Sequence, residues 1–183
     1  MTIGPRTLPA QPGGNKSAWE IVTHGAPETI AVGRALAGYL NDGDVVLLHG
    51  DLGAGKTTLA KGIAAALGVS DVVSSPSFTL VNEYDTGPAS AVSRLYHLDL
   101  YRLHDEGDLA SIGFDDLVAS TGGVVLVEWP ERATTALPER FLMIAIETVG
   151  SDNRRLRFVP SPDDEVWMHR FARLHADLAT NQN

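Results

Sequence analysis

The chain contains no cysteine. Disulfides, thiolate catalysis and cysteine-ligated zinc or iron–sulfur sites are therefore excluded. Positive charge is also scarce, because 14 Lys and Arg residues stand against 23 Asp and Glu residues and leave a net charge of −9. An acidic chain of this kind is a poor binder of nucleic acid on its own, since that affinity comes mainly from basic side chains on phosphates. Apolar runs are short, and none reaches the roughly 18 residues of a transmembrane helix, so we predict no membrane span.

The length of 183 residues is typical of about one domain. Prolines and glycines fill the first 17 residues, which hold no apolar segment of the kind a secretory signal needs. We therefore predict a disordered tail over residues 1–18, a single domain over residues 19–183, and a cytoplasmic protein.

Residues 50–57, GDLGAGKT, fit the phosphate-binding pattern G-x-x-x-x-G-K-[ST] at every fixed position. The glycines let backbone N–H groups surround a phosphate, and the following helix presents its positive end to the same anion. Lys56 is predicted to reach the β- and γ-phosphates, and the Thr57 hydroxyl to bind Mg²⁺. The nucleotide contacts predicted from this loop are Asp51, Leu52, Gly53, Ala54, Gly55, Lys56, Thr57 and Thr58.

The segments around this loop predict the fold class. An apolar run at residues 45–48 precedes the loop, and a helix with apolar residues at helical spacing follows it. Strands alternating with helices predict an α/β, P-loop NTPase-like three-layer sandwich with a mostly parallel, mixed central sheet. Further strands are expected at residues 20–23, 78–84, 92–101, 124–127, 141–149 and 154–159, and a C-terminal helix at residues 163–180 with Trp167, Phe171, Leu174 and Leu178 as its apolar stripe.

A carboxylate at the end of another strand is needed to complete a magnesium site of this type. Two segments qualify. Residues 124–128, VVLVE, form a fully apolar run that ends in Glu128, whereas residues 95–99, LYHLD, end in Asp99 but alternate in polarity as an edge or half-exposed strand does. The pattern alone favours Glu128 and leaves Asp99 as the alternative.

Four strings now stand in order along the chain: HGDLGAGKTT at 49–58, SPSFTLV at 75–81, YHLDLYRL at 96–103 and LVEWPE at 126–131. Together they resemble the TsaE (YjeE) family, the bacterial ATPase of tRNA threonylcarbamoyladenosine synthesis. The second and third strings are far more specific than the phosphate loop, and the similarity runs from about residue 22 to residue 159. The family usually has Thr where this chain has Ser77, which keeps the hydroxyl.

The resemblance implies a protein that binds ATP and Mg²⁺, hydrolyses ATP slowly alone, and works with TsaB and TsaD. Those partners modify tRNAs that read codons beginning with A, and the ATP cycle would reset their complex between turnovers, so this protein would meet tRNA only indirectly. Thr57 and Glu128 would hold the metal, and Asp99 would be needed for hydrolysis beside Lys56. Trp129 and, by a loose alignment, Arg154 would lie near the nucleotide, and residues 74–79 would sense it.

Two other functions remain open from the sequence: a P-loop small-molecule kinase and a nucleotide-regulated binding module. A kinase usually carries an arginine-bearing lid over the phosphates, and no such segment is evident, nor is any Arg placed by a motif against the γ-phosphate. His97 is predicted to be a packed, hydrogen-bonded histidine, and the alternative is a catalytic base in contact with Asp99 on the same face of the strand. His49 is predicted to be structural.

Overall fold

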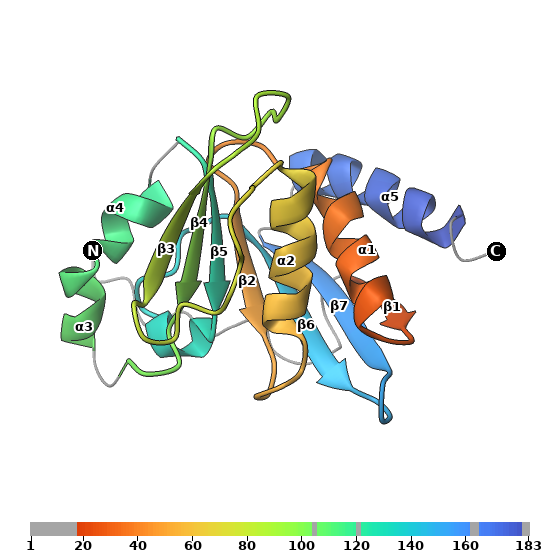
Figure 1. The fold of residues 1–183 in the computed structure, drawn as a ribbon, viewed down its shortest axis with the longest axis horizontal. Helices are drawn as coiled ribbons and strands as arrows, with labels where there is room; N and C mark the ends of the chain where they lie inside the picture. Colours follow the sequence, from red (N-terminus) through yellow and green to blue (C-terminus); the bar gives the residue numbers. More distant parts are fainter. Residues whose placement is uncertain (1–17, 104–105, 120–121, 162–164, 181–183) are drawn as a thin grey trace.

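The computed structural model describes residues 18–103, 106–119, 122–161 and 165–180. Its strands are β1 (Trp19–Thr23), β2 (Val45–His49), β3 (Val81–Asp85), β4 (Arg94–Asp99), β5 (Val124–Glu128), β6 (Phe141–Thr148) and β7 (Arg154–Ser161). Its helices are α1 (Ala26–Ala37), α2 (Lys56–Ala66), α3 (Glu106–Ser111), α4 (Phe114–Ala119), α5 (Glu165–Thr180) and the 3-10 helix η1 (Pro130–Ala133). Figure 1 shows these elements around one twisted sheet.

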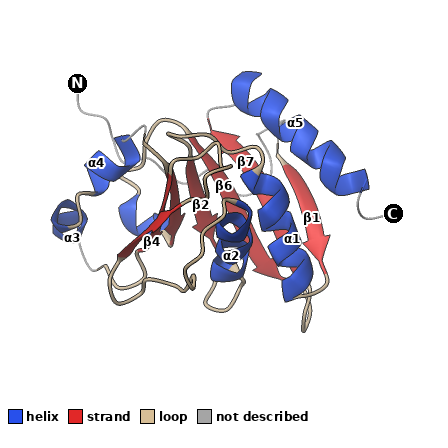
Figure 2. Ribbon diagram, turned by 45° about the horizontal axis from the view of Figure 1, so that its top comes forward, coloured by secondary structure: helices blue, strands red, loops and turns tan. Residues whose placement is uncertain are grey.

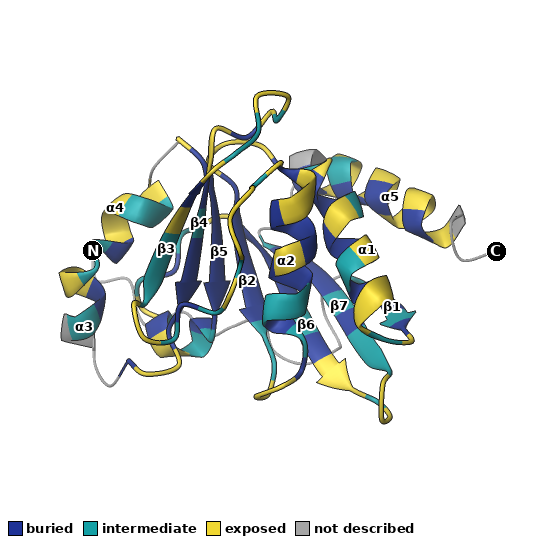
Figure 3. Ribbon diagram, viewed as in Figure 1, coloured by how far each residue is buried: buried dark blue, intermediate teal, exposed yellow. Residues whose placement is uncertain are grey.

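The strands form a seven-stranded sheet in the order β1-β7-β6-β2-β5-β4-β3. The four central strands β6, β2, β5 and β4 run parallel, and antiparallel pairs lie at both edges. The apolar runs of β2 and β5 occupy the middle of the sheet, where both of their faces are covered (Figure 3). The mixed α/β sheet predicted from the sequence is thus confirmed.

Two apolar clusters pack on opposite faces of this sheet. Alternate residues of β2 divide between them: Val46 and Leu48 contact the cluster that holds α1, α2 and α5, while Val45 and Leu47 contact the cluster that holds Leu109 and Phe114 of α3 and α4. Figure 2 shows α1 and α2 in front of the sheet, with α3 and α4 towards one end and α5 towards the other. The arrangement is the three-layer sandwich expected from the alternation of strands and helices.

Helices α1 and α2 cross at close range through two glycines. A Cβ atom at Gly33 would lie 2.4 Å from the Leu59 carbonyl oxygen, and one at Gly62 would lie 2.2 Å from the Ile30 carbonyl oxygen. Only glycine permits this approach, because any side chain would have to displace backbone. The crossing fixes α2, and with it the loop that leads into α2, against the sheet.

Two strand predictions were wrong in detail. The strand expected from Phe78 begins at Val81, because Leu80 N–H donates to the Pro76 carbonyl at 2.7 Å and Leu80 takes a φ of 64°. The segment ending in Asp99 is no edge or half-exposed strand, since β4 pairs with both β3 and β5. His97 and Asp99 are buried there in spite of their polarity, because both have partners, described below.

The C-terminal helix carries the predicted stripe, as Trp167, Phe171, Leu174 and Leu178 are all buried. Its expected first residues, 163 and 164, and residues 1–17 of the expected tail lie outside the described residues, and the single-domain boundary at residue 19 stays a prediction. Among the helices that the structure describes, none combines the length and the apolar character required to cross a membrane.

Candidate functional site

The glycine-rich segment forms a loop between the end of β2 and the start of α2, which is the strand–loop–helix context predicted for a phosphate loop. Gly55, the residue before α2, has a φ of 113°, which few residues other than glycine adopt. Gly50 is held by close approach, because a Cβ there would lie 2.3 Å from the Ile146 carbonyl oxygen. The loop therefore keeps its shape through glycine at both ends.

Lys56 is buried and turned towards this loop. Its Nζ donates to the carbonyl oxygens of Gly50 at 2.6 Å and of Asp51 at 2.9 Å, and it lies 3.9 Å from the centre of the Trp129 ring. Burial lowers the pKa of Lys56 below its usual value, and nearby carboxylates, Glu128 first, act in the opposite direction. The ammonium group is thus positioned at the loop that a phosphate would occupy.

Thr57 and Glu128 meet across the site. The Thr57 hydroxyl donates to Glu128 Oε1 at 2.8 Å, and the Glu128 side chain is 3% exposed at the end of β5. His97, on the neighbouring strand β4, is fully buried and contacts the same Oε1 through Nε2 at 2.9 Å. The prediction of a packed, hydrogen-bonded His97 is confirmed, but the described partner is Glu128.

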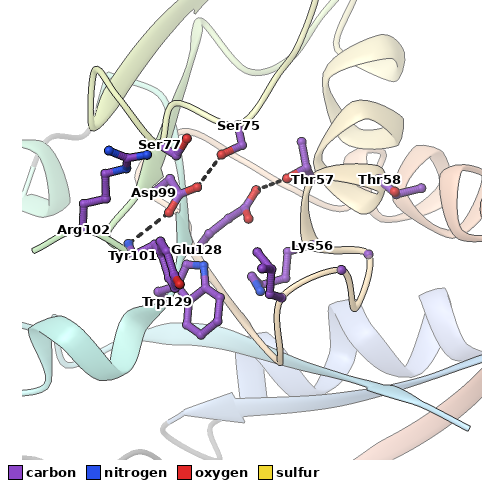
Figure 4. Close-up of a pocket in the computed structure, with 13 residues that line it drawn as sticks. Lys56, Thr57, Thr58, Ser75, Ser77, Asp99, Tyr101, Arg102, Glu128 and Trp129 are labelled. Carbon is purple, nitrogen blue, oxygen red and sulfur yellow. Dashed lines mark hydrogen bonds between the residues drawn. The ribbon is translucent and has the colours of Figure 1, made fainter.

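Asp99 lies directly beside Glu128, because β4 and β5 place the two residues at the same register position. Its Oδ2 accepts a short hydrogen bond from the Ser75 hydroxyl, and its Oδ1 accepts one from the Tyr101 N–H at 3.0 Å. Figure 4 shows the two carboxylates side by side, opposite the start of α2. The two acids that the sequence offered as alternatives therefore belong to one site.

A cavity of about 390 Å³ opens over these residues (Figure 4). Its lining is Leu52, Gly53, Gly55, Lys56, Thr57, Thr58, Ser75, Ser77, Asp99, Tyr101, Arg102, Glu128 and Trp129. The phosphate loop, Asp99 and the Glu128–Trp129 pair, which are far apart in the sequence, are brought together by the parallel strands β2, β4 and β5. The carboxyl ends of these strands lie on one edge of the sheet (Figure 1).

Three of the predicted nucleotide contacts are not among the residues that line the cavity: Asp51, Ala54 and Arg154. Ala54 is buried beneath the loop, where its N–H donates to the Asp51 carbonyl at 3.1 Å. Arg154 donates from Nε to the Ala54 carbonyl at 3.0 Å and from Nη1 to the Asn153 carbonyl at 2.9 Å. Arg154 thus supports the loop from behind, and its contact with a nucleotide stays a prediction.

Tyr101 and Arg102 were not singled out by the sequence reasoning, although both follow Asp99 in one of the strings that carry the resemblance. The Arg102 guanidinium lies 4.0 Å from the centre of the Phe78 ring, and Phe78 is 81% exposed. A basic residue two or three positions after a strand-end acid was the available signal. The Arg102 side chain places a positive charge on the wall of the cavity opposite Lys56 (Figure 4).

His49, at the end of β2, pairs with Glu131 of η1 at 3.1 Å. The hydrogen bond to Glu131 raises the pKa of His49, although partial burial lowers it. Burial raises the pKa of Glu131, but the hydrogen bond from His49 and the nearby charges outweigh it and lower that pKa overall. This pair joins the strand before the loop to the turn that follows Trp129.

The acids and the hydroxyl suit a magnesium ion that arrives with a polyphosphate. Within the described residues no group of three His, Asp or Glu side chains is arranged to hold a metal by itself. Thr57 and Glu128 offer two hard oxygens in contact with each other, and magnesium commonly takes one or two protein ligands with phosphates and waters completing its shell. The residues present therefore fit that ion.

Residues 23–156 match the family model described as threonylcarbamoyl adenosine biosynthesis protein TsaE. The chain belongs to the TsaE family. The matched range contains the loop, both carboxylates and every residue of the cavity lining. The resemblance predicted from the four strings is thereby confirmed, together with the family's role in tRNA threonylcarbamoyladenosine biosynthesis.

Curated relatives carry the same description. The TsaE protein of Bacillus subtilis is 43% identical over 131 residues, which cover 72% of this chain and 78% of that protein. The TsaE protein of Treponema pallidum is 37% identical over 135 residues, covering 74% and 96%. Among solved structures, that of YdiB from Bacillus subtilis matches with a TM-score of 0.69 and 33% identity over 91% of this chain and 97% of that chain. The likeness supports the P-loop type of α/β fold.

Proposed function

We propose that this protein binds ATP with Mg²⁺ in the cavity and hydrolyses ATP slowly by itself. The observation that carries the proposal is the convergence of Lys56, the Thr57–Glu128 pair and Asp99 around one cavity beside a glycine-rich loop. In the cell the ATP cycle would serve tRNA threonylcarbamoyladenosine formation, with TsaB and TsaD as partners, in the cytoplasm.

Phosphate binding follows from the loop and from Lys56. The free N–H groups at the start of α2 favour an anion at that position. Lys56 Nζ now donates to two loop carbonyls, and it would exchange them for phosphate oxygens, which accept stronger, charge-assisted hydrogen bonds. Thr57 and Glu128 would hold magnesium, which would neutralise charge on the phosphates.

Asp99 is the candidate for orienting the attacking water. A carboxylate can accept a proton of that water and aim its oxygen at the γ-phosphorus, after which the bond to the β-phosphate oxygen breaks and ADP and phosphate remain. Ser75 now occupies Oδ2 of Asp99. Because Ser75 belongs to the loop before β3, a change in that loop on nucleotide binding would free the carboxylate.

A low basal rate follows from the charges around the cavity. Arg102 lines the wall, but its guanidinium stacks on Phe78, so its charge is not held against the phosphates. A partner that supplied or redirected a cation there would raise the rate, as in other phosphoryl-transfer enzymes. The net charge of −9 supports contact with tRNA through TsaB and TsaD rather than directly.

The test is steady-state phosphate release by the wild type, Lys56→Ala and Lys61→Ala, each with and without TsaB and TsaD. Lys61 is an exposed lysine on the same helix and serves as the matched control. We expect the partners to raise the rate of phosphate release by the wild type and by Lys61→Ala. The rate of Lys56→Ala should be at least about 100-fold below that of the wild type, because the substitution removes a phosphate contact. Equal rates with and without partners would contradict the proposed partnership, and no ATP-dependent phosphate release would contradict the ATPase.

A further inference from the structure

His97 is a buried polar residue on the inner side of the site. It lies on β4, two residues before Asp99, with its side chain fully buried, and its Nε2 is 2.9 Å from Glu128 Oε1. Because an ionised carboxylate only accepts hydrogen bonds, Nε2 carries the proton and donates it to Glu128. His97 is absent from the cavity lining, and among the lining residues its hydrogen bond is to Glu128.

The hydrogen bonds around Glu128 are distributed unevenly between its two oxygens. Within the described residues, the Thr57 hydroxyl and His97 Nε2 both bond to Oε1. Oε2 is therefore the oxygen that remains for a ligand in the cavity. The last torsion of a glutamate is broad and roughly two-fold, so without outside support the carboxylate would exchange its two oxygens and rotate.

The other nitrogen of His97 argues against a role in packing alone. Nδ1 is buried and has no hydrogen-bond partner among the described residues. A buried polar atom left without a partner is costly, and an apolar residue of similar size would avoid that cost. The bond from Nε2 to Glu128 is the contact that an apolar residue could not replace.

We propose that His97 is a positioning residue that locks the Glu128 carboxylate with Oε2 directed to a divalent cation. The inference rests on the proposed function, because the cation is the one expected with ATP. His97 itself touches neither the cation nor the nucleotide. Removing a hydrogen-bond donor of this kind behind a metal ligand typically costs 10- to 100-fold in metal affinity.

The test compares His97→Phe, which removes the donor, with His97→Gln, whose amide can still donate to Glu128. For each protein, ADP affinity is measured by calorimetry without Mg²⁺ and then across a Mg²⁺ titration. We expect His97→Phe to need at least about 10-fold more Mg²⁺ for half of the gain in ADP affinity. Its affinity for ADP without Mg²⁺ should stay within about 2-fold of the wild type, and His97→Gln should recover most of the loss.

A second arm places His97→Phe in a Glu128→Ala background. There the substitution should have no further effect on the Mg²⁺ titration, because the carboxylate it acts through is gone. If His97→Phe does not fold, as judged by circular dichroism, His97→Asn takes its place, since its shorter amide cannot reach Glu128.

The outcomes separate the two proposals. A wild type that binds ADP with no dependence on Mg²⁺ would overturn the metal site of the proposed function and this inference with it. A wild type that depends on Mg²⁺, beside a His97→Phe variant with an unchanged titration, would overturn the role of His97 alone. Equal losses in His97→Phe and His97→Gln would also overturn it, because they would point to packing.

Discussion

The ammonium group of Lys56 lies 3.9 Å from the centre of the Trp129 ring. Trp129 directly follows Glu128 and has a φ of 61°, a conformation that is uncommon for a tryptophan. The turn that begins at Pro130 holds the backbone there and brings the ring under the lysine. One tryptophan thus borders both the phosphate loop and the end of β5.

This contact predicts an optical signal for nucleotide binding. When Lys56 leaves the loop carbonyls for a phosphate, the charge over the Trp129 ring moves, and the indole emission should change. ATP titrations followed by tryptophan fluorescence should show a saturable change in the wild type. Trp129→Phe should lose the change while Trp19→Phe keeps it, and a signal that survives in Trp129→Phe would place its source elsewhere.

Replacing Asp99 tests its proposed role in hydrolysis. Asp99→Asn keeps the shape of the side chain but weakens its hold on a water proton, so kcat should fall at least about 100-fold. ATP affinity should stay within about 3-fold, because Asp99 is not a proposed phosphate ligand. Ser75→Ala is the matched control, since it removes the hydrogen bond to Oδ2 and leaves the carboxylate. An Asp99→Asn variant that still supports tRNA modification would favour a nucleotide-regulated binding module.

The His49–Glu131 pair predicts a dependence of stability on pH. The pKa of His49 is raised in the folded protein. The contribution of His49 to folding stability is therefore complete below the unfolded pKa of 6.5, and it disappears as the pH rises through the raised pKa. The pKa of Glu131 is lowered, so its contribution is complete above 4.5 and disappears as the pH falls through the lowered pKa. The pair therefore stabilises most between these two values.

Urea unfolding of the wild type and Glu131→Gln checks this window. Because His49 is 43% exposed, solvent screening keeps the expected difference in unfolding free energy below about 1 kcal/mol. The difference should be largest at about pH 5.5 and should shrink towards about pH 8.5 as His49 loses its proton. A difference that grows with pH would contradict the assignment.

The glycine crossing of α1 and α2 predicts a large effect from one methyl group. Gly33→Ala would bring a Cβ within 2.4 Å of the Leu59 carbonyl oxygen and should cost about 1–3 kcal/mol of unfolding free energy. Gly38→Ala is the control, because Gly38 has helical φ and ψ and its Cβ would lie 3.5 Å from the nearest atom. It should be neutral or stabilising by up to about 1 kcal/mol. Thermal and urea unfolding measure both variants. Equal changes in unfolding free energy for Gly33→Ala and Gly38→Ala would contradict the close contact between α1 and α2.

The fold was predictable where one local pattern determined the outcome. The apolar runs of β2 and β5 allowed only buried strands, and the glycine pattern between Gly50 and Gly55 required the turn that the structure has. The burial of the strand ending in Asp99 was harder to predict, because its alternating polar residues are typical of a strand that faces solvent. Their burial depends on partners from other elements, Glu128 for His97 and Ser75 for Asp99, and a single strand carries no trace of those partners.

The candidate site divides in the same way. Lys56, Thr57 and Glu128 followed from residue types and spacing, but their distances to one another depend on which strands are neighbours. Arg102 was missed although it belongs to the YHLDLYRL string, because its place on the cavity wall depends on the turn after β4. Arg154 donates to the Ala54 carbonyl of the loop, a contact that a loose alignment could not reveal, and its contact with a nucleotide stays a prediction.

The equal register of Asp99 and Glu128 limits how this part of the chain can change over evolution. Successive side chains of a strand point to opposite faces, so inserting or deleting one residue within β4 would turn its acid towards α3 and α4 while Glu128 stayed beside α2. The two acids lie either on the same face of the sheet or on opposite faces, and no intermediate arrangement exists. Length changes in this lineage should therefore collect in the connections outside β4 and β5, and a natural variant with an odd-length change inside either strand should have lost the paired acids altogether.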